Sequence, residues 1–387
     1  MRHIHCLNNI SKVGLKALPE TYHLTDQISN SDAILVRSAQ MHDLELPKSV
    51  LAVARAGAGV NNIPLENYAK KGVVVFNTPG ANANAVKELT LAGMLLASRD
   101  IYGGMQWIKE NAKDPNITKS IEKAKSQFAG TEINNKTIGI IGLGAIGILI
   151  AQACDALGLN VVGYSLPEPL KGVMHLLPKN IKIVDSKETL FQMSDFISLN
   201  VPLIEETKHT INKETLKLMK DGVIILNFAR DGLVNDDDIE VALESGKVRH
   251  YVTDFPNQKT ANMNGVIAIP HLGASTEEAE DNCAYMAAQQ VKNYIETGTI
   301  KHSVNFGDIE ADDLNGQGRI AIIYMTEQIK IADIKKRIEQ KLSILSFKTS
   351  QKNQFGYALI DTKELADEET IEMLLKIEGL IRVRKII

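Results

Sequence analysis

Cysteine is scarce in this sequence, and neither sign of charge is in large excess. The three cysteines, Cys6, Cys154 and Cys283, lie far apart, and no CxxC or Cys/His spacing indicates a zinc site. We therefore expect no bound metal, and free structural thiols in a reducing cytoplasm. Lys and Arg total 43 against 47 Asp and Glu. This near-balance gives no electrostatic reason to expect nucleic acid or an anionic membrane as a partner.

Long hydrophobic runs are also rare. The N-terminus lacks the extended apolar region of a signal peptide. One uncharged stretch, IGIIGLGAIGILIAQAC (138–154), is slightly short of the ~20 residues that a membrane-spanning helix needs. Its glycines predict a turn that divides it into a strand and a helix. The chain has 387 residues, of which 44% are hydrophobic, so two or three domains with sizeable cores are expected.

Short apolar runs rich in β-branched residues recur along the chain and are separated by helical patterns. They do not alternate between polar and apolar residues, which is typical of strands buried on both faces of a parallel sheet. The succession of strands and helices predicts an α/β doubly wound fold with right-handed crossovers. The predicted strands are 33–36, 50–54, 73–76, 137–142, 160–164, 196–199, 223–226, 251–254 and 266–269.

The spacing of these runs predicts two parallel sheets. Helical stretches at 84–110 and 275–298 could carry the chain between them; the second begins with a Ser-x-x-Glu capping box and ends at Gly298. An acidic, Gly/Asn-rich linker then precedes a βαββαβ pattern. The expected domains are a substrate-binding domain at 1–85 and 286–306, a Rossmann dinucleotide-binding domain at 86–285, the linker at 307–317, and the βαββαβ domain at 318–387.

The strongest chemical signal is a glycine motif. Gly142, Gly144 and Gly147 form G-x-G-x-x-G directly after a predicted strand and at the start of a helix. The first glycine permits a tight turn, the second lets the backbone approach a pyrophosphate, and the third allows close packing of helix on strand. The helix N-terminus then offers N–H donors to phosphate oxygens. This setting predicts dinucleotide binding; the alternative is a glycine-rich turn with no ligand.

The residue expected at the adenosine ribose is unusual. The second strand of such a unit normally ends in an acid, and here Ser165 stands at that offset. A serine can bond the 2′-hydroxyl but repels a 2′-phosphate less than a carboxylate does. NAD is the expected cofactor, and NADP stays open. Glu168 is close enough in sequence to substitute for the acid.

Two charged residues follow buried strands, where doubly wound sheets bind their ligands. Arg230 comes just after the run at 223–226 and offers a bidentate fork to a carboxylate. His271 follows the run at 266–269 and precedes a capped helix. A lone histidine is usually structural, but one placed opposite an arginine and a dinucleotide site is better explained as an acid or base. The acid run at 236–238 is better explained as helix capping than as a metal site.

Several segments, taken together, resemble the D-isomer-specific 2-hydroxyacid dehydrogenases, and the resemblance covers nearly the whole chain. The segments are LVRSAQ (35–40), RAGAGVNNI (55–63), NTPGANANAVKELTLAGMLLASR (77–99), GIIGLGAIG (139–147), LNVPLIEETKHTIN (199–212), NFARDGLVN (227–235) and PHLGAST (270–276).

The resemblance implies roles for individual residues. Arg230 would hold the substrate carboxylate and carbonyl, and His271 would take the hydroxyl proton as hydride leaves C2 for the nicotinamide. Asp254 would accept a hydrogen bond from the nicotinamide carboxamide. The other implied cofactor-binding residues are Gly142, Gly144, Ala145, Ile146, Gly147, Ser165, Val201, Phe228, Ala229, Gly273 and Ala274. The implied substrate-binding residues are Arg37, Ser38, Arg55, Gly57, Gly59 and Asn82.

Within the family, the motifs are most similar to those of members that oxidise 3-phospho-D-glycerate to 3-phosphohydroxypyruvate with NAD, the first step of L-serine biosynthesis. Arg37 and Arg55 favour a phosphorylated substrate. One alternative is another D-2-hydroxyacid dehydrogenase, such as a glyoxylate/hydroxypyruvate reductase. The other is a non-catalytic interaction protein that senses a dinucleotide.

The C-terminal pattern resembles an ACT domain. A small domain with a one-sided sheet usually pairs with a copy or a neighbour, and we expect self-association as a dimer or tetramer. Such domains often bind an effector at Asn-x-Pro-Gly, but the matching stretch here is YMTEQIKIADI (324–334), without proline or glycine. Dimerisation alone is therefore the expected role, and effector binding stays open.

The loop TDFPNQKT (253–260) departs from the family pattern. The family usually has a glutamate about five residues after the Asp254 equivalent, and that offset gives Lys259, or Gln258 in a shorter loop. Asn257 or Gln258 is expected to stand where the carboxylate would contact His271. A neutral amide can orient an imidazole but stabilises its protonated form less than a carboxylate does.

Overall fold

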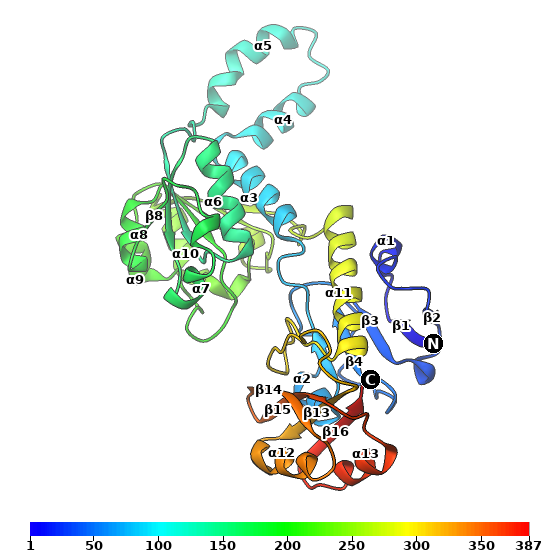
Figure 1. The fold of residues 1–387 in the computed structure, drawn as a ribbon. Helices are drawn as coiled ribbons and strands as arrows, with labels where there is room; N and C mark the ends of the chain where they lie inside the picture. Colours follow the sequence, from blue (N-terminus) through cyan, green and yellow to red (C-terminus); the bar gives the residue numbers. More distant parts are fainter. Residues whose placement is uncertain (387) are drawn as a thin grey trace. The chain divides into compact units, whose positions relative to one another are not determined.

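The computed structural model describes residues 1–386, apart from the side chains of Glu168 and Pro169. The chain divides into two compact units (Figure 1). The first unit comprises Met1–Asn82 and Glu277–Ile387, and the second comprises Ala83–Thr276. Because the boundaries follow chain contacts only, the four-part domain division expected from the sequence stays a prediction.

The first unit contains a five-stranded parallel sheet in the order β2-β1-β3-β4-β5. Helix α11 packs on one face of this sheet through small and apolar side chains, and α2 packs on the other. The strands are β1 (Arg2–Cys6), β2 (Tyr22–Thr25), β3 (Ala33–Val36), β4 (Ala52–Arg55) and β5 (Val74–Phe76). The helices are α1 (Lys12–Leu15), α2 (Leu65–Lys70) and α11 (Glu277–Thr297).

The first unit also contains a four-stranded antiparallel sheet in the order β14-β15-β13-β16. Its elements are β13 (Gly318–Met325), α12 (Ile331–Glu339), β14 (Ile344–Lys352), β15 (Phe355–Thr362), α13 (Glu368–Leu375) and β16 (Leu380–Lys385), the predicted βαββαβ order. Alternate side chains of β13 divide between two cores: Ile320 and Ile322 face α12 and α13, while Ala321 and Ile323 join the core under α11. The second face of this sheet is therefore covered by α11 and the rest of the first unit.

The second unit is a seven-stranded parallel sheet in the order β12-β11-β10-β9-β6-β7-β8. The chain runs outward from β6 to β8 and then returns to β9, so a topological switch point lies between β6 and β9. The strands are β6 (Thr137–Ile141), β7 (Asn160–Tyr164), β8 (Lys182–Ile183), β9 (Phe196–Leu199), β10 (Val223–Asn227), β11 (Val248–Thr253) and β12 (Val266–Ala268).

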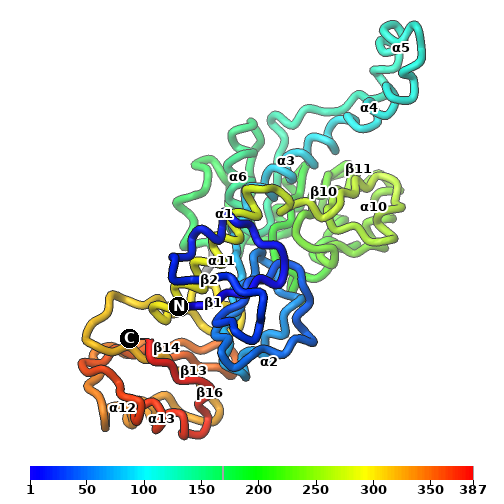
Figure 2. Tube along the Cα trace, turned by 90° about the vertical axis from the view of Figure 1, so that its right-hand side faces the viewer, coloured from blue at the N-terminus to red at the C-terminus, as the bar shows by residue number. Residues whose placement is uncertain are grey.

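Helices cover both faces of the seven-stranded sheet. Apolar residues of α3 and α6 pack on one face, and those of α8, α9 and α10 pack on the other. Helices α4 and α5 extend away from this sheet (Figures 1 and 2). The helices are α3 (Ala83–Ser98), α4 (Ile101–Glu110), α5 (Ile117–Ala124), α6 (Ala145–Ala156), α7 (Pro167–Lys171), α8 (Lys187–Met193), α9 (Lys213–Leu218) and α10 (Asp236–Glu244). Short 3-10 turns lie at Ile28–Asn30, Lys125–Phe128, Met174–Leu176, Asp231–Leu233 and Thr260–Asn262.

The predicted fold class, two doubly wound parallel sheets with a small βαββαβ sheet, is confirmed. Every apolar run predicted to be a strand overlaps one, and the uncharged stretch 138–154 divides into β6 and α6 as predicted. In the described part of the chain no helix is both long and apolar enough to cross a membrane. The stretch 84–110 is helical as expected, but it is divided into α3 and α4: Asp100 begins the second helix, because its side chain accepts the N–H of Gly103 at 2.9 Å.

Candidate active site

The glycine turn lies at the switch point of the seven-stranded sheet, between β6 and α6. Gly142 has φ +93°, and a Cβ there would lie 2.5 Å from the carbonyl oxygen of Asn200. A Cβ on Gly147 would collide with the carbonyl oxygen of Gly142, so α6 packs directly on the turn. A Cβ on Gly144 would meet no atom within 4 Å. The outer side of the turn is therefore open to a ligand, and a side chain at either other position would change its backbone.

The other residues predicted at the dinucleotide surround this turn. Ala145 and Ile146 open α6, whose N-terminal N–H groups point out of the turn. Ser165 follows β7 directly, and Val201 follows β9 and packs against Gly142. These residues come from neighbouring parallel strands, so they share the carboxyl edge of the sheet. The side chain of Glu168, the alternative to Ser165, lies outside those that the structure describes.

The turn after β10 holds Arg230 and is organised by Asn227, which sequence reasoning missed. The Asn227 side chain is fully buried. Its Oδ1 accepts from the N–H groups of Ala229 and Arg230 at 3.2 and 3.4 Å, and its Nδ2 donates to the Arg230 carbonyl at 2.8 Å. Phe228 is buried beneath the turn against Gly93 of α3. Asn227 thus fixes the backbone from which the Arg230 guanidinium projects.

Asp254 follows β11 and is only 1% exposed. Its Oδ2 accepts the N–H of Gly273 at 2.9 Å, while its buried Oδ1 has no hydrogen-bond partner among the residues that the structure describes. Burial raises the pKa of Asp254, and the Gly273 N–H and the charges of His271 and Arg230 act in the opposite direction. An unpaired buried acceptor is costly by itself. It is suited to an N–H donor supplied by a ligand, such as a carboxamide.

Phe255 contacts both residues predicted to be catalytic. The Arg230 guanidinium carbon is 5.4 Å from the centre of the Phe255 ring. The imidazole of His271 lies against the same ring, with centroids 4.3 Å apart and planes at 46°. The guanidinium and the imidazole therefore contact the same aromatic ring. Sequence reasoning missed this role, although an aromatic residue next to an acid at a strand end was a usable signal.

The expectation that Asn257 would contact His271 is wrong. The Asn257 amide nitrogen donates to Asp236 at 2.7 Å, and its Oδ1 accepts from the N–H of Thr260 at 2.9 Å. Asn257 is therefore used to fasten the loop to the start of α10. Gln258 is exposed, and its carbonyl oxygen accepts from Asn262. Among the described side chains, none forms a hydrogen bond with the His271 imidazole.

The substrate-binding residues predicted from the resemblance all lie in the first unit, at the carboxyl ends of its strands. Asn8, which was not predicted, accepts three successive N–H groups on one Oδ1: Arg37 and Ser38 at 3.1 Å, and Ala39 at 2.9 Å. This arrangement fixes the loop after β3. Asn82 ends the first segment of the unit.

Two arginines meet between the loops after β3 and β4. The Arg55 Nε donates to the Arg37 carbonyl at 2.9 Å, and its Nη1 donates to the Gly59 carbonyl. Gly57 has φ +151°, and a Cβ there would lie 3.4 Å from the Arg55 guanidinium. The Arg37 guanidinium forms an ion pair with Glu280 of α11 at 2.7 Å. Each unit thus carries its own set of predicted residues: catalytic and cofactor-binding in the second, substrate-binding in the first.

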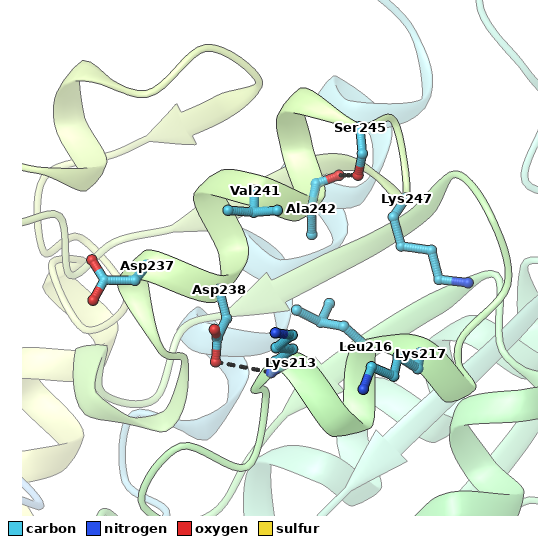
Figure 3. Close-up of a pocket in the computed structure, with 9 residues that line it drawn as sticks. All are labelled: Lys213, Leu216, Lys217, Asp237, Asp238, Val241, Ala242, Ser245 and Lys247. Atoms are coloured by element: carbon cyan, nitrogen blue, oxygen red, sulfur yellow. Dashed lines mark hydrogen bonds between the residues drawn. The ribbon is translucent and has the colours of Figure 1, made fainter.

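A surface pocket of about 550 Å³ lies elsewhere in the second unit, between α9 and α10 (Figure 3). Its apolar floor is formed by Leu216, Val241 and Ala242, with lysines at its rim. The nine lining residues drawn include none of the predicted site residues.

The glycine turn at the switch point, together with an arginine and a histidine at the same edge of the sheet, defines a Rossmann-type dinucleotide-binding protein. Residues 91–273 match the family described as D-isomer specific 2-hydroxyacid dehydrogenase, NAD binding domain. The hydroxypyruvate reductase of Thermotoga maritima is 37% identical over 265 residues, which are 65% of this chain and 81% of that protein. The chain belongs to the D-isomer-specific 2-hydroxyacid dehydrogenase family, and its NAD-binding domain is the one of that family.

Other relatives are similar over more of this chain. The D-3-phosphoglycerate dehydrogenase of Methanocaldococcus jannaschii is 32% identical over 325 residues, or 80% of this chain. The chain spans 59% of that relative and 56% of the one from Archaeoglobus fulgidus. Among solved structures, NAD⁺-bound 3-phosphoglycerate dehydrogenase of Entamoeba histolytica has a TM-score of 0.62 and 25% identity, with 79% of this chain and 98% of that chain covered.

Proposed function

We propose that this protein is an NAD-dependent D-3-phosphoglycerate dehydrogenase, which oxidises 3-phospho-D-glycerate to 3-phosphohydroxypyruvate. The observation that carries the proposal is the contact of the Arg230 guanidinium and the His271 imidazole with the same Phe255 ring, at the edge that holds the glycine turn. A carboxylate-binding group and a proton acceptor then stand close together. Family membership and the names of the relatives from M. jannaschii and A. fulgidus support this choice of reaction.

The residues present fit a nicotinamide dinucleotide. The open side of the turn at Gly144 leaves room for a pyrophosphate, and the N-terminus of α6 supplies N–H donors to it. The buried, unpaired Oδ1 of Asp254 supplies an acceptor for the carboxamide N–H. When bound, NAD accepts the hydride that leaves C2 of the substrate.

The protein's own side chains then complete the reaction. The Arg230 fork binds the substrate carboxylate, which fixes C2 and its hydroxyl. His271 accepts the hydroxyl proton as the carbonyl forms. Phe255 contacts both groups, and its apolar face lowers their exposure to water. Arg37 and Arg55 are the proposed partners of the substrate phosphate.

The test is the rate of formation of reduced cofactor, measured by absorbance with 3-phospho-D-glycerate and NAD. His271→Ala should lower kcat by about 10²–10⁴-fold while NAD binding is retained, because a general base typically contributes that much. His175→Ala, an exposed histidine of the same unit, is the matched control and should behave like the native protein. Native-like turnover of His271→Ala would refute the assigned role.

One rival is favoured by a specific observation, since this chain covers 81% of the Thermotoga maritima relative, which is a hydroxypyruvate reductase. Reduction of hydroxypyruvate and of 3-phosphohydroxypyruvate, compared at equal concentrations, separates the two activities. The non-catalytic dinucleotide sensor predicts no turnover with either compound, so any reproducible turnover excludes it.

The preference between NAD and NADP depends on Ser165, which lacks the charge that would repel a 2′-phosphate. We propose that NAD is preferred because the neighbouring turn carries no predicted arginine for the extra phosphate. Parallel assays with the two cofactors measure the preference directly. Ser165→Asp should leave activity with NAD in place and reduce any activity with NADP.

Self-association is proposed to use helix α4, which extends from its own sheet (Figure 2). Tyr102 is 66% exposed and Met105 is 65% exposed on this helix, and Ile101 and Ile108 are also exposed. An apolar stripe on a projecting helix is typical of a protein–protein surface. A second copy of this chain, in a dimer or tetramer, is the proposed partner.

A further inference from the structure

The ion pair between Arg37 and Glu280 places an acid directly on a residue proposed to bind the substrate phosphate. The Arg37 Nη2 and the Glu280 Oε1 are 2.7 Å apart, and the side chains are 40% and 42% exposed. Glu280 lies in the first turns of α11, near Asp281, whose carboxylate accepts from Ser11. This contact holds α11 on α1 at the turn that carries Glu280.

Arg55 lies beside this ion pair, because its Nε donates to the Arg37 carbonyl at 2.9 Å. The charges of Arg37, Arg55 and Glu280 all act on the thiol of Cys283, which lies one turn further along α11; burial raises the pKa of that thiol and the two arginines lower it. The backbone around Arg37 is fixed by Asn8 and by the Arg55 side chain. Two positive charges and one negative charge therefore occupy a small, rigid region of the first unit.

We propose that Glu280 is a specificity-determining residue of this region: it reduces the attraction of Arg37 for anions, and it does so more for a phosphate dianion than for a singly charged group. The proposal rests on the proposed function, because it assumes that Arg37 binds the substrate phosphate. Glu280 acts on the substrate through its charge and through Arg37, and takes no part in the transfer of hydride or proton. Its consequence is a weak ground-state interaction with the phosphate, hence a higher KM without a change in kcat.

The size of the effect follows from Coulomb's law. A unit charge a few ångströms from a singly charged ligand changes its affinity by about two- to fivefold in a water-like medium. Because the energy scales with ligand charge, a dianion should respond by about the square of that factor, roughly 4- to 25-fold. Glu280→Gln keeps the size and hydrogen-bonding ability of the side chain and removes only the charge.

The first experiment measures kcat and KM of the full-length native protein and of Glu280→Gln. The KM for 3-phospho-D-glycerate should fall by about 4- to 25-fold, with kcat unchanged within about twofold and the KM for unphosphorylated D-glycerate changed far less. Glu277→Gln removes an equal charge from an exposed position one turn earlier on α11 and should lower KM less. An unchanged or higher KM in Glu280→Gln overturns the proposal, because a residue that merely positions Arg37 would raise KM when removed.

A double-mutant cycle tests whether Glu280 acts through Arg37. In an Arg37→Met background, Glu280→Gln should change the KM much less than it does in the native background. An equal effect in both backgrounds overturns the proposal. Calorimetric titration of 3-phospho-D-glycerate gives a readout that does not require turnover: tighter binding by Glu280→Gln supports the proposal, and equal, weaker or undetectable binding overturns it. Binding without turnover by the native protein would instead refute the proposed function.

Discussion

The ion pair between Arg319 and Asp361 allows a sharp prediction about stability. The two residues are 3% and 4% exposed and form two hydrogen bonds, of 2.6 and 2.8 Å. The Arg319 guanidinium also donates to the carbonyl oxygens of Asp312 at 2.9 Å and of Thr297 at 3.4 Å. One buried side chain thus connects β13 and β15 to the end of α11 and to the segment that follows it. The substitution Asp361→Asn would leave the buried positive charge of Arg319 without a counter-charge.

The expected cost is large because removing one partner leaves an uncompensated charge in the interior. Breaking a buried ion pair in this way typically costs about 3–5 kcal/mol, a considerable part of the ~5–15 kcal/mol that separates folded from unfolded domains. Urea unfolding followed by far-ultraviolet circular dichroism measures the loss. Hydrogen exchange resolved by peptide should show faster exchange in β13 and in the segment around Asp312.

Two controls distinguish the buried charge from a general effect of substitution. Glu339→Gln removes an exposed partner of Lys335, 3.8 Å away on α12, and should cost no more than about 0.5 kcal/mol. Replacing both buried partners, Arg319→Met with Asp361→Leu, should recover much of the loss because no charge remains buried. If Asp361→Asn proved as stable as Glu339→Gln, the reasoning about the buried pair would be refuted.

Three further predictions concern the second unit. Phe255→Leu should lower kcat by about two- to tenfold in steady-state assays, since the ring's contacts with Arg230 and His271 are together worth about 0.5–1.5 kcal/mol. Asp254→Asn should melt at a higher temperature than the native protein in calorimetry, by a margin that grows with pH. Burial raises the pKa of Asp254 in the folded protein. The native protein therefore loses stability as pH rises from the ordinary pKa of an aspartate to the raised pKa, whereas the Asp254→Asn variant has no group that titrates there. Met105→Asp should lower the mass measured by sedimentation equilibrium, because it places a charge in the apolar stripe of α4.

Each of these has an outcome that contradicts it. An unchanged kcat for Phe255→Leu would show that the ring does not position Arg230 and His271. A difference in melting temperature that is constant with pH would remove Asp254 as the titrating group. For helix α4, Lys109→Asp introduces an aspartate at another exposed position. An equal loss of mass in Met105→Asp and Lys109→Asp would show that charge alone, and not the apolar stripe, is responsible.

The fold was predictable because local and long-range signals agree. Runs such as VIIL at 223–226 are apolar on both faces, and only the interior of a parallel sheet buries both. Strands β1, β2 and β8 were missed for the opposite reason: RHIHC and YHLT mix polar with apolar residues, and KI is two residues long. β2 and β8 are edge strands, so less of their surface is buried.

The site was only partly predictable. Gly142 and Gly147 could be assigned from spacing, because a backbone that excludes side chains leaves a glycine signature. The conformation of the loop after Asp254 could not be predicted. Its sequence permits Asn257 either to face the His271 imidazole or to fasten the loop to α10. The structure selects the second through a 2.7 Å bond to Asp236, an acid that the sequence pattern assigned to helix capping. A hydrogen bond between residues far apart in the chain leaves no periodic pattern in the sequence from which it could be predicted.

The antiparallel sheet packs on the core under α11 as well as on its own two helices. Tyr357 donates to the Gly298 carbonyl at 2.5 Å, and Arg384 donates to the Ile295 carbonyl at 3.0 Å, so this sheet also caps the end of α11. A gene shortened after residue 317 would therefore not yield a trimmed enzyme lacking an accessory module. Its product would expose an apolar sheet-binding face and free carbonyls at the end of the helix whose other end carries Glu280. For recombination between relatives, the usable crossover points lie at the junctions with Ala83–Thr276, and the C-terminal sheet is inherited together with the first 82 residues.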